Sequence, residues 1–335
     1  MNNKIFHVNL IKKIIIPKAH SWLCFSGWCL FIFLFLTNAQ AAHYYSTFSR
    51  PTAEPDLVIG HHNPSDATIL HKFFRDNKEL FEVTYHTDHL GHRISPGKYE
   101  GRNKFALFMG CSFTFGVGVQ DNETVPYYFA EKQKDYVPYN YGLGASGPHQ
   151  FLRLLETKNL REEIKEEQGI GIFYYIEEHI QRATMHLPSI GWLRQSPHYE
   201  LNQNQELEYQ GNFEEDKSLW AQLLLKLAFQ NFDYFTHHIF PRVSKQDGDT
   251  TCKIIKKIKS EFLKQFPNSQ FVVLYNSGDM IYPMKNCLKK EGINYVSVAP
   301  RVNIQLGKKA SIYGDGHPTA LANELIANIL AEELP

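Results

Sequence analysis

From Lys104 onward, short apolar runs alternate with longer stretches in which apolar residues recur at helical spacing. The run 105–109 is aromatic-rich and too short to propagate as a helix, which favours a strand buried on both faces. Similar runs at 136–142, 170–176, "FVVLYN" and "NYVSVA" complete the predicted strands. Helices are predicted between them, near 126–133, 148–158, 251–265, 281–291 and in "PTALANELIANILAEEL". This alternation is typical of a parallel sheet with helices on both faces.

The same pattern divides the chain into regions. We expect a lead-in segment over 42–103 and an α/β domain over 104–335 with an insertion at about 184–250. The insertion is predicted to hold a hairpin around 202–204 and an amphipathic helix over 216–235. In the lead-in, "SRPTAEPDLVIGHHNPSDATILHKFF" is expected to be loop-like, and "LFEVTYHTDHLGHRISPG" to be extended up to a turn.

Residues 1–41 carry a targeting pattern. Several lysines precede an uncharged run from Ser21 to Leu36, and "AQA" at 39–41 has the A-x-A form of a signal cleavage site. We predict a signal peptide cleaved after residue 41, with an uncleaved signal anchor as the alternative. The protein is therefore expected to be secreted or periplasmic, or else anchored in the inner membrane and facing the periplasm. Contact with a membrane is expected only through such an anchor.

The amino-acid composition argues against a nucleic-acid-binding function. Lys plus Arg and Asp plus Glu each total 35, so the formal net charge is zero. Without a basic field or a basic stripe with interleaved aromatics, nucleic acid is not an expected partner. The 335 residues suffice for a full core. They give no indication of the oligomeric state.

Three cysteines remain outside the predicted signal: Cys111, Cys252 and Cys287. An oxidising compartment permits a Cys252–Cys287 disulfide, which we predict, leaving Cys111 free. His86, His89 and His92 invite a metal hypothesis, but their spacing would need a helix in a stretch that contains Gly91, Pro96 and Gly97. No C-x-x-C or Cys/His zinc spacing occurs either, so we expect neither a metal nor another cofactor.

Two stretches carry candidate chemistry. In "KFALFMGCSFTFGVGVQDNETVP", Ser112 follows the first predicted strand at a crossover to a helix, which is where ligands bind in open α/β sheets. In "IYGDGHPTALANELIA", Asp315 lies two residues before His317, and a nearby carboxylate can fix the tautomer of an imidazole and stabilise its protonated form. Taken singly, Ser112 could merely cap a turn, and Asp315 could cap the final helix with His317 at the surface.

Together the stretches resemble blocks of the SGNH (GDSL-type) hydrolases, in particular their extracytoplasmic bacterial-type members. "GCSFTFG" resembles the G-D-S-x-x-x-G block, and "DGHPTALANELIA" resembles the last block. "YNYGLGASGPHQ" is similar to the second block, and "GIFYYIEEHIQRA" lies where the third should be. "TYHTDHLGHR" is similar to a lead-in that precedes the nucleophile block in extracytoplasmic members. The resemblance spans about residues 80–335, broken by the insertion.

The resemblance implies a three-layer α/β/α, flavodoxin-like SGNH fold and a catalytic set. Ser112 would be the nucleophile, His317 its general base and Asp315 the residue that orients the base; serine needs such a base at neutral pH. Oxyanion donors would be the N–H groups of Ser112 and of Ala145, which is flanked by Gly144 and occupies the position of the family's second-block glycine.

Besides Ala145 and the two-residue spacing of Asp315 and His317, where the commoner pattern has three, the chain departs from the family pattern at two places. Cys111 replaces the aspartate of G-D-S and is a rival nucleophile. The third-block asparagine is missing, with Glu178 or a neighbour in its place. Because one oxyanion donor is worth roughly 2.7 to 4 kcal/mol, we expect either that His179 substitutes for the asparagine or that the enzyme is slower with its esters. The rival α/β-hydrolase motif G-x-S-x-G would need glycine where Thr114 stands.

The expected function is that of a serine esterase, a carboxylic ester hydrolase that cleaves or transfers a short acyl group. Its substrate would be a small-molecule or glycan ester, on a carbohydrate or a lipid. One alternative is an O-acyltransferase of exported polysaccharide, since the two-residue spacing of Asp315 and His317 resembles that of such members. The other is a non-catalytic glycan-binding or assembly protein on the same fold, which the departures from the blocks motivate.

Overall fold

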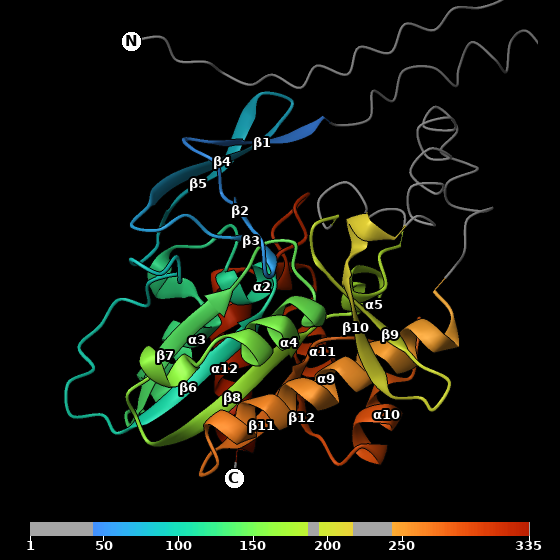
Figure 1. Cartoon of the computed structure of the whole chain (residues 1–335). Helices are drawn as coiled ribbons and strands as arrows, with labels where there is room; N and C mark the ends of the chain where they lie inside the picture. The colour runs from blue at the N-terminus through green and yellow to red at the C-terminus, as the bar shows by residue number, and fades with distance from the viewer. Residues whose placement is uncertain (1–42, 187–193, 217–242, 335) are drawn as a thin grey trace, which may run out of the picture. The chain divides into compact units, whose positions relative to one another are not determined.

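A computed structural model describes residues 43–186, 194–216 and 243–334. The predicted signal and nearly all of the helix expected over 216–235 lie outside these residues. The central sheet has the order β12-β11-β8-β6-β7, and each neighbouring pair is parallel (Figure 1). Its strands are β6 (Lys104–Gly110), β7 (Tyr136–Gly142), β8 (Gln168–Tyr175), β11 (Gln270–Tyr275) and β12 (Asn294–Ser297).

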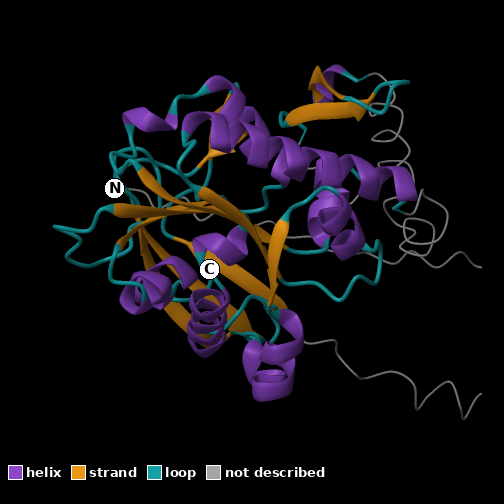
Figure 2. Ribbon diagram, turned by 90° about the horizontal axis from the view of Figure 1, so that it is seen from below, coloured by secondary structure: helices purple, strands orange, loops and turns teal. Residues whose placement is uncertain are grey.

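Alternate residues of β6 face two separate cores. Leu107 and Met109 pack in one core, whereas Ala106 and Phe108 pack in the other. Helices cover both faces of the sheet (Figure 2), which confirms the predicted three-layer α/β/α architecture. The first face is covered by α4 (Pro148–Thr157), α5 (Glu178–Ala183), α9 (Lys245–Gln265) and α10 (Met284–Lys290). The second is covered by α3 (Val125–Lys132), α11 (Ala299–Leu306) and α12 (Ala320–Glu333).

The lead-in is more ordered than its sequence predicted. β1 (Tyr44–Phe48), β4 (Thr68–Arg75) and β5 (Lys78–His86) form an antiparallel sheet, and β2 (Glu54–Asp56) pairs with β3 (Gly60–His62). The loop expectation was wrong for β4, where Ile69, His71 and Phe73 all point inward and are buried. A histidine in the middle of this buried face hides the apolar alternation that identifies a strand.

The insertion contains the predicted hairpin, formed by β9 (Pro197–Leu201) and β10 (Leu207–Asn212). Its turn is held by the Asn202 side chain, which accepts N–H bonds from Asn204 and Glu206. The predicted Cys252–Cys287 disulfide is present and joins α9 to α10. Within the described ranges, none of the helices has the length and apolar character of a membrane span.

Candidate active site

The turn that carries Ser112 depends on two glycines. β6 ends at Gly110 and the short helix α2 (Ser112–Phe115) begins two residues later. Gly110 has φ 152°, and a Cβ there would lie 2.3 Å from Thr114 Oγ1. A Cβ at Gly142 on β7 would lie 2.1 Å from the backbone nitrogen of Phe115. The bare backbone at both positions lets the turn lie against the strands, with Ser112 9% exposed at their carboxyl ends.

His317 and Asp315 lie in the loop that precedes α12. A β-bridge between Ser311 and Pro318 closes this loop. Gly314 has φ 79°, and a Cβ there would lie 2.2 Å from the ring of Tyr44 on β1. The lead-in therefore packs directly against the loop that carries the histidine.

The structure brings the three predicted catalytic residues together. His317 Nε2 lies 2.8 Å from Ser112 Oγ, and its Nδ1 lies 2.6 Å from Asp315 Oδ2. Burial raises the pKa of Asp315, but the hydrogen bond and charge of His317 outweigh burial and leave this pKa below its ordinary value. An ionised Asp315 holds the proton on Nδ1, so that Nε2 accepts from the serine hydroxyl. The imidazole also packs against the ring of Phe113.

A pocket of about 510 Å³ opens over Ser112. The lead-in contributes Phe48, Thr52, Ala53, His61, Asn63 and Tyr85 to its lining. The α/β domain contributes Ser112, Phe115, Val117, Gly144, Ala145, Arg182 and His317. Sequence reasoning identified the reacting groups of this pocket but none of the lead-in residues.

Backbone N–H groups are available as oxyanion donors. Ser112 and Ala145 both line the pocket, and within the described part of the chain neither N–H has an acceptor. Ala145 has φ 60°, the left-handed conformation that favours glycine. His61 braces this turn through a 2.9 Å bond between its Nε2 and the Gly144 carbonyl. Burial lowers the pKa of His61, so that the ring is neutral and donates to this carbonyl.

The structure does not place His179 where an oxyanion donor must be. Its ring is fully buried against Phe173 and Tyr175, and it is not among the residues that line the pocket. Its Nδ1 accepts the Ile176 N–H, and Glu178 beside it is exposed. The prediction for His179 is therefore corrected, because helix α5 turns this side chain into the core.

Arg182 from the same helix lines the pocket instead. Its Nη1 donates to the Ser146 carbonyl at 2.9 Å, beside the Ala145 turn. Arg182 lies within the stretch 171–183 that resembles the third block, but the family pattern gives it no role, so the sequence alone did not single it out. Its signal is that it is the one arginine or lysine of that stretch.

Arg93 supports the chain just beyond the nucleophile; it is the last residue of "TYHTDHLGHR", a stretch that the resemblance marked without giving Arg93 a role. It is 2% exposed and pairs with Asp121 at 3.0 Å. Its guanidinium donates to the carbonyls of Phe115, Gly116 and Val119 and lies over the Tyr85 ring. A residue of the lead-in thus fixes the segment that follows Ser112.

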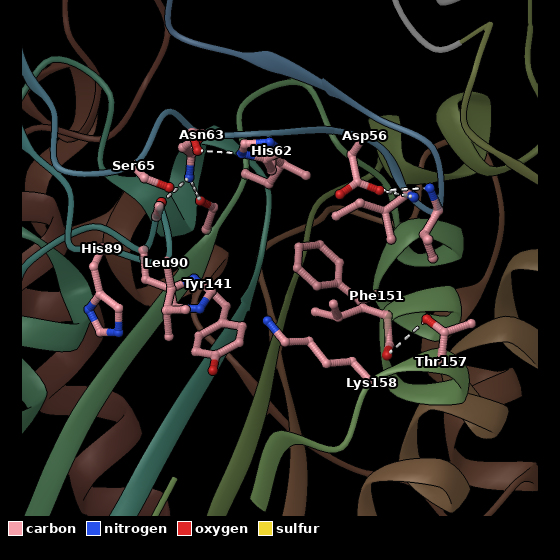
Figure 3. Close-up of a pocket in the computed structure, with 17 residues that line it drawn as sticks. Asp56, His62, Asn63, Ser65, His89, Leu90, Tyr141, Phe151, Thr157 and Lys158 are labelled. Carbon is pink, nitrogen blue, oxygen red and sulfur yellow. Dashed lines mark hydrogen bonds between the residues drawn. The ribbon is translucent and has the colours of Figure 1, made fainter. Parts of the chain in front are cut away.

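A second pocket of about 420 Å³ is shown in Figure 3. It shares the lining residue Asn63 with the first pocket. Asn63 Nδ2 donates to the carbonyls of Gly91 and Gly142. Figure 3 shows Lys158 reaching across this pocket toward Tyr141.

His89 and His92 line this second pocket, but they belong to no cluster of potential metal ligands in the described residues. Among the residues that the structure describes, such a cluster is formed only by His198, Glu200 and Asp216, where His198 Nε2 lies 3.2 Å from a Glu200 oxygen. None of these three residues lines the Ser112 pocket.

No protein-family model and no curated protein matches the sequence. The structure aligns with a member of the lipolytic protein G-D-S-L family from Veillonella parvula DSM 2008, with 11% identity over 69% of this chain and 97% of that one and a TM-score of 0.38. It aligns with an acetyl xylan esterase at 10% identity, over 69% of this chain and 100% of the other, with a TM-score of 0.41. A third match, to a two-domain esterase active on acetylated mannans, has 11% identity, covers 68% of this chain and 48% of the other, and has a TM-score of 0.38. At these identities the likeness concerns the fold, so what the site can do follows from its own geometry.

Proposed function

We propose that this protein is an SGNH-type serine esterase that removes a short acyl group from a carbohydrate or lipid ester, or passes it to another hydroxyl. The observation that carries the proposal is the 2.8 Å contact between Ser112 Oγ and His317 Nε2, with Asp315 on the other ring nitrogen. A protein that only binds glycans has no need for a serine hydroxyl joined to an oriented base. We also expect it to act outside the cytoplasm, which the Cys252–Cys287 disulfide supports.

The proposed reaction has two steps. Ser112 Oγ bonds to the acyl carbonyl carbon while His317 takes its proton, and the N–H groups of Ser112 and Ala145 are available to the oxyanion. His317 returns the proton to the leaving alcohol, and the acyl group stays on Ser112. Water, or a sugar hydroxyl in transfer, then attacks with His317 again as base. This releases the carboxylic acid or the new ester and restores the serine.

The test compares Ser112→Ala, His317→Ala and the double variant on a short-chain aryl ester. Each single variant is expected to lose about 10⁴-fold or more in kcat, and the double variant to be scarcely worse, because the residues act as a unit. A serine-directed phosphonate should add its mass to Ser112, and more slowly in His317→Ala. Asp315→Asn should be milder or comparable.

Cys111→Ser is the matched control, since Cys111 is fully buried in the core. It should keep most of the activity. A wild-type rate for Ser112→Ala, or loss of turnover in Cys111→Ser with Ser112 unlabelled, contradicts the proposal. Adding a sugar acceptor and measuring acylated product against free acid distinguishes transfer from hydrolysis.

A further inference from the structure

Arg182 stands out among the residues around Ser112 because of its charge. It lines the pocket together with Ala145 and His317, and its bond to the Ser146 carbonyl fixes the guanidinium beside the catalytic turn. The side chain is half-buried, so a ligand in the pocket can reach its remaining N–H donors.

Within the described part of the chain, this positive charge has no counter-ion. No carboxylate lies within 4.0 Å of the Arg182 guanidinium, whereas every other described arginine except Arg102 pairs with one. No aspartate or glutamate of the described residues lines the pocket either. Burial raises the pKa of Tyr85 to about 12 and lowers that of His61, so both of these lining side chains are neutral near pH 7.

An uncompensated charge beside apolar walls is costly unless a partner is supplied. Phe48, Phe115 and Val117 line the same pocket. Guanidinium binds carboxylate and phosphate groups in a two-point geometry, which makes arginine suited to recognise an anionic substrate. Two backbone N–H groups, at Ser112 and Ala145, are already available to an oxyanion, which leaves the guanidinium for a charged group on the substrate.

We infer that the pocket selects esters carrying a carboxylate or phosphate group, such as acylated acidic sugars, and that Arg182 pairs with this anionic group. The inference rests on the proposed esterase function and names its substrate class. It predicts that selectivity for charge, rather than the acyl-transfer step itself, depends on Arg182.

The experiment measures acetate release from a matched pair of substrates. One is an O-acetylated methyl glucuronoside with a free carboxylate, and the other is the same sugar with this carboxylate neutralised as its methyl ester. The wild type is expected to prefer the acid by about tenfold or more in kcat/KM, and the preference should shrink as ionic strength rises. In Arg182→Gln the ratio of the two kcat/KM values should fall toward one, while Arg182→Lys keeps part of it. The control Arg102→Gln, another half-buried arginine without a carboxylate partner, should keep the full ratio.

A wild type without preference, or an Arg182→Gln variant that slows both substrates by the same factor, overturns the inference; the second result would assign Arg182 to the oxyanion or to structure. An acetylated phosphosugar, compared with its dephosphorylated form, identifies which anion is preferred. Calorimetric binding of free glucuronate to Ser112→Ala, with and without Arg182→Gln, needs no turnover. If the wild type turns over neither these esters nor the short-chain aryl ester, the esterase proposal fails while this binding measurement still decides the role of Arg182.

Discussion

The parallel-sheet domain and the lead-in build one pocket by different means. The sheet domain supplies the reacting groups, on a turn after β6 and a loop before α12. The lead-in supplies walls and braces: Tyr44 against the histidine loop, His61 on the Gly144 carbonyl, and Arg93 beneath the segment after Ser112. Changes in the lead-in should therefore act mainly on the stability of the fold and the position of the catalytic residues, whereas changes at Ser112 or His317 should act on the chemical steps.

The largest effect expected in the lead-in is that of Arg93→Met. It leaves the buried side of Asp121 without its arginine and three carbonyls without their donor, so we expect a loss of about 3 to 5 kcal/mol in the free energy of unfolding. Urea unfolding of the purified variant measures this loss. Arg153→Met removes a partly exposed pair with Glu156 and should cost less than about 1 kcal/mol. If Arg93→Met unfolds at the wild-type midpoint, the bracing role assigned to the lead-in is wrong.

Two buried histidines, one in each region, should make the stability of the protein depend on pH. Burial lowers the pKa of His71 in the lead-in to about 4 and that of His149 on α4 to about 3. In the unfolded chain both imidazoles bind a proton near pH 6.5, whereas in the folded protein they do so only near the lowered pKa values. The free energy of unfolding is therefore highest above pH 6.5 and decreases as the pH falls toward the folded pKa values. At pH 5 each histidine should lower the free energy of unfolding by about 2 kcal/mol relative to its value above pH 6.5.

The two histidines differ in partners, so their variants should differ too. His71 bonds to Tyr85 and Ser46, whereas neither ring nitrogen of His149 has a partner among the described residues. His149→Leu should therefore be neutral or stabilising at pH 7.5 and flatten the acid dependence, while His71→Phe should destabilise at both pH values. Thermal unfolding at pH 7.5 and 5 measures this. Equal behaviour of the two variants would remove the distinction.

A moderate effect is expected for Tyr85→Phe. The hydroxyl accepts the Gly118 N–H at 2.9 Å and shares a hydrogen bond of 2.6 Å with His71 Nδ1, so its removal should cost about 1 to 3 kcal/mol. Tyr313→Phe is the control, since that side chain is exposed and its hydroxyl accepts from Arg75 at the surface. Denaturant midpoints that shift equally in the two variants would contradict the prediction.

The smallest effect concerns the sheet domain. Ala145→Gly should raise stability by up to about 1 kcal/mol, because glycine adopts φ 60° without the penalty that a Cβ imposes. Turnover should persist, since the backbone N–H remains. Gly144→Ala is the counterpart: a Cβ there meets nothing within 4 Å, so the melting temperature should barely change. A fall in the melting temperature of Ala145→Gly would show that the turn is not strained.

The sequence predicted the elements of the sheet domain well because each of them is marked by residues that are close together in the chain. Apolar runs identify buried strands, and Ser112, Asp315 and His317 lie in short motifs next to strand and helix ends. The lead-in resisted prediction because single buried polar residues, His71 and Arg93, are recognised only once their partners are known. The direction of the His179 side chain could not be predicted for a related reason, because it depends on where helix α5 begins.

The position of α12 has a consequence for folding order. This last helix packs against α3, and Asn323 on it donates to the Glu123 carbonyl at 3.0 Å. His317 lies just before α12 near the end of the chain. Ser112 follows β6, which pairs with β7 and β8, and all three strands lie much earlier in the chain. The base can meet the nucleophile only after this long-range docking, which is a slow type of contact to form. A chain arrested before that event would hold a serine without a base, so ester turnover is a readout of completed folding.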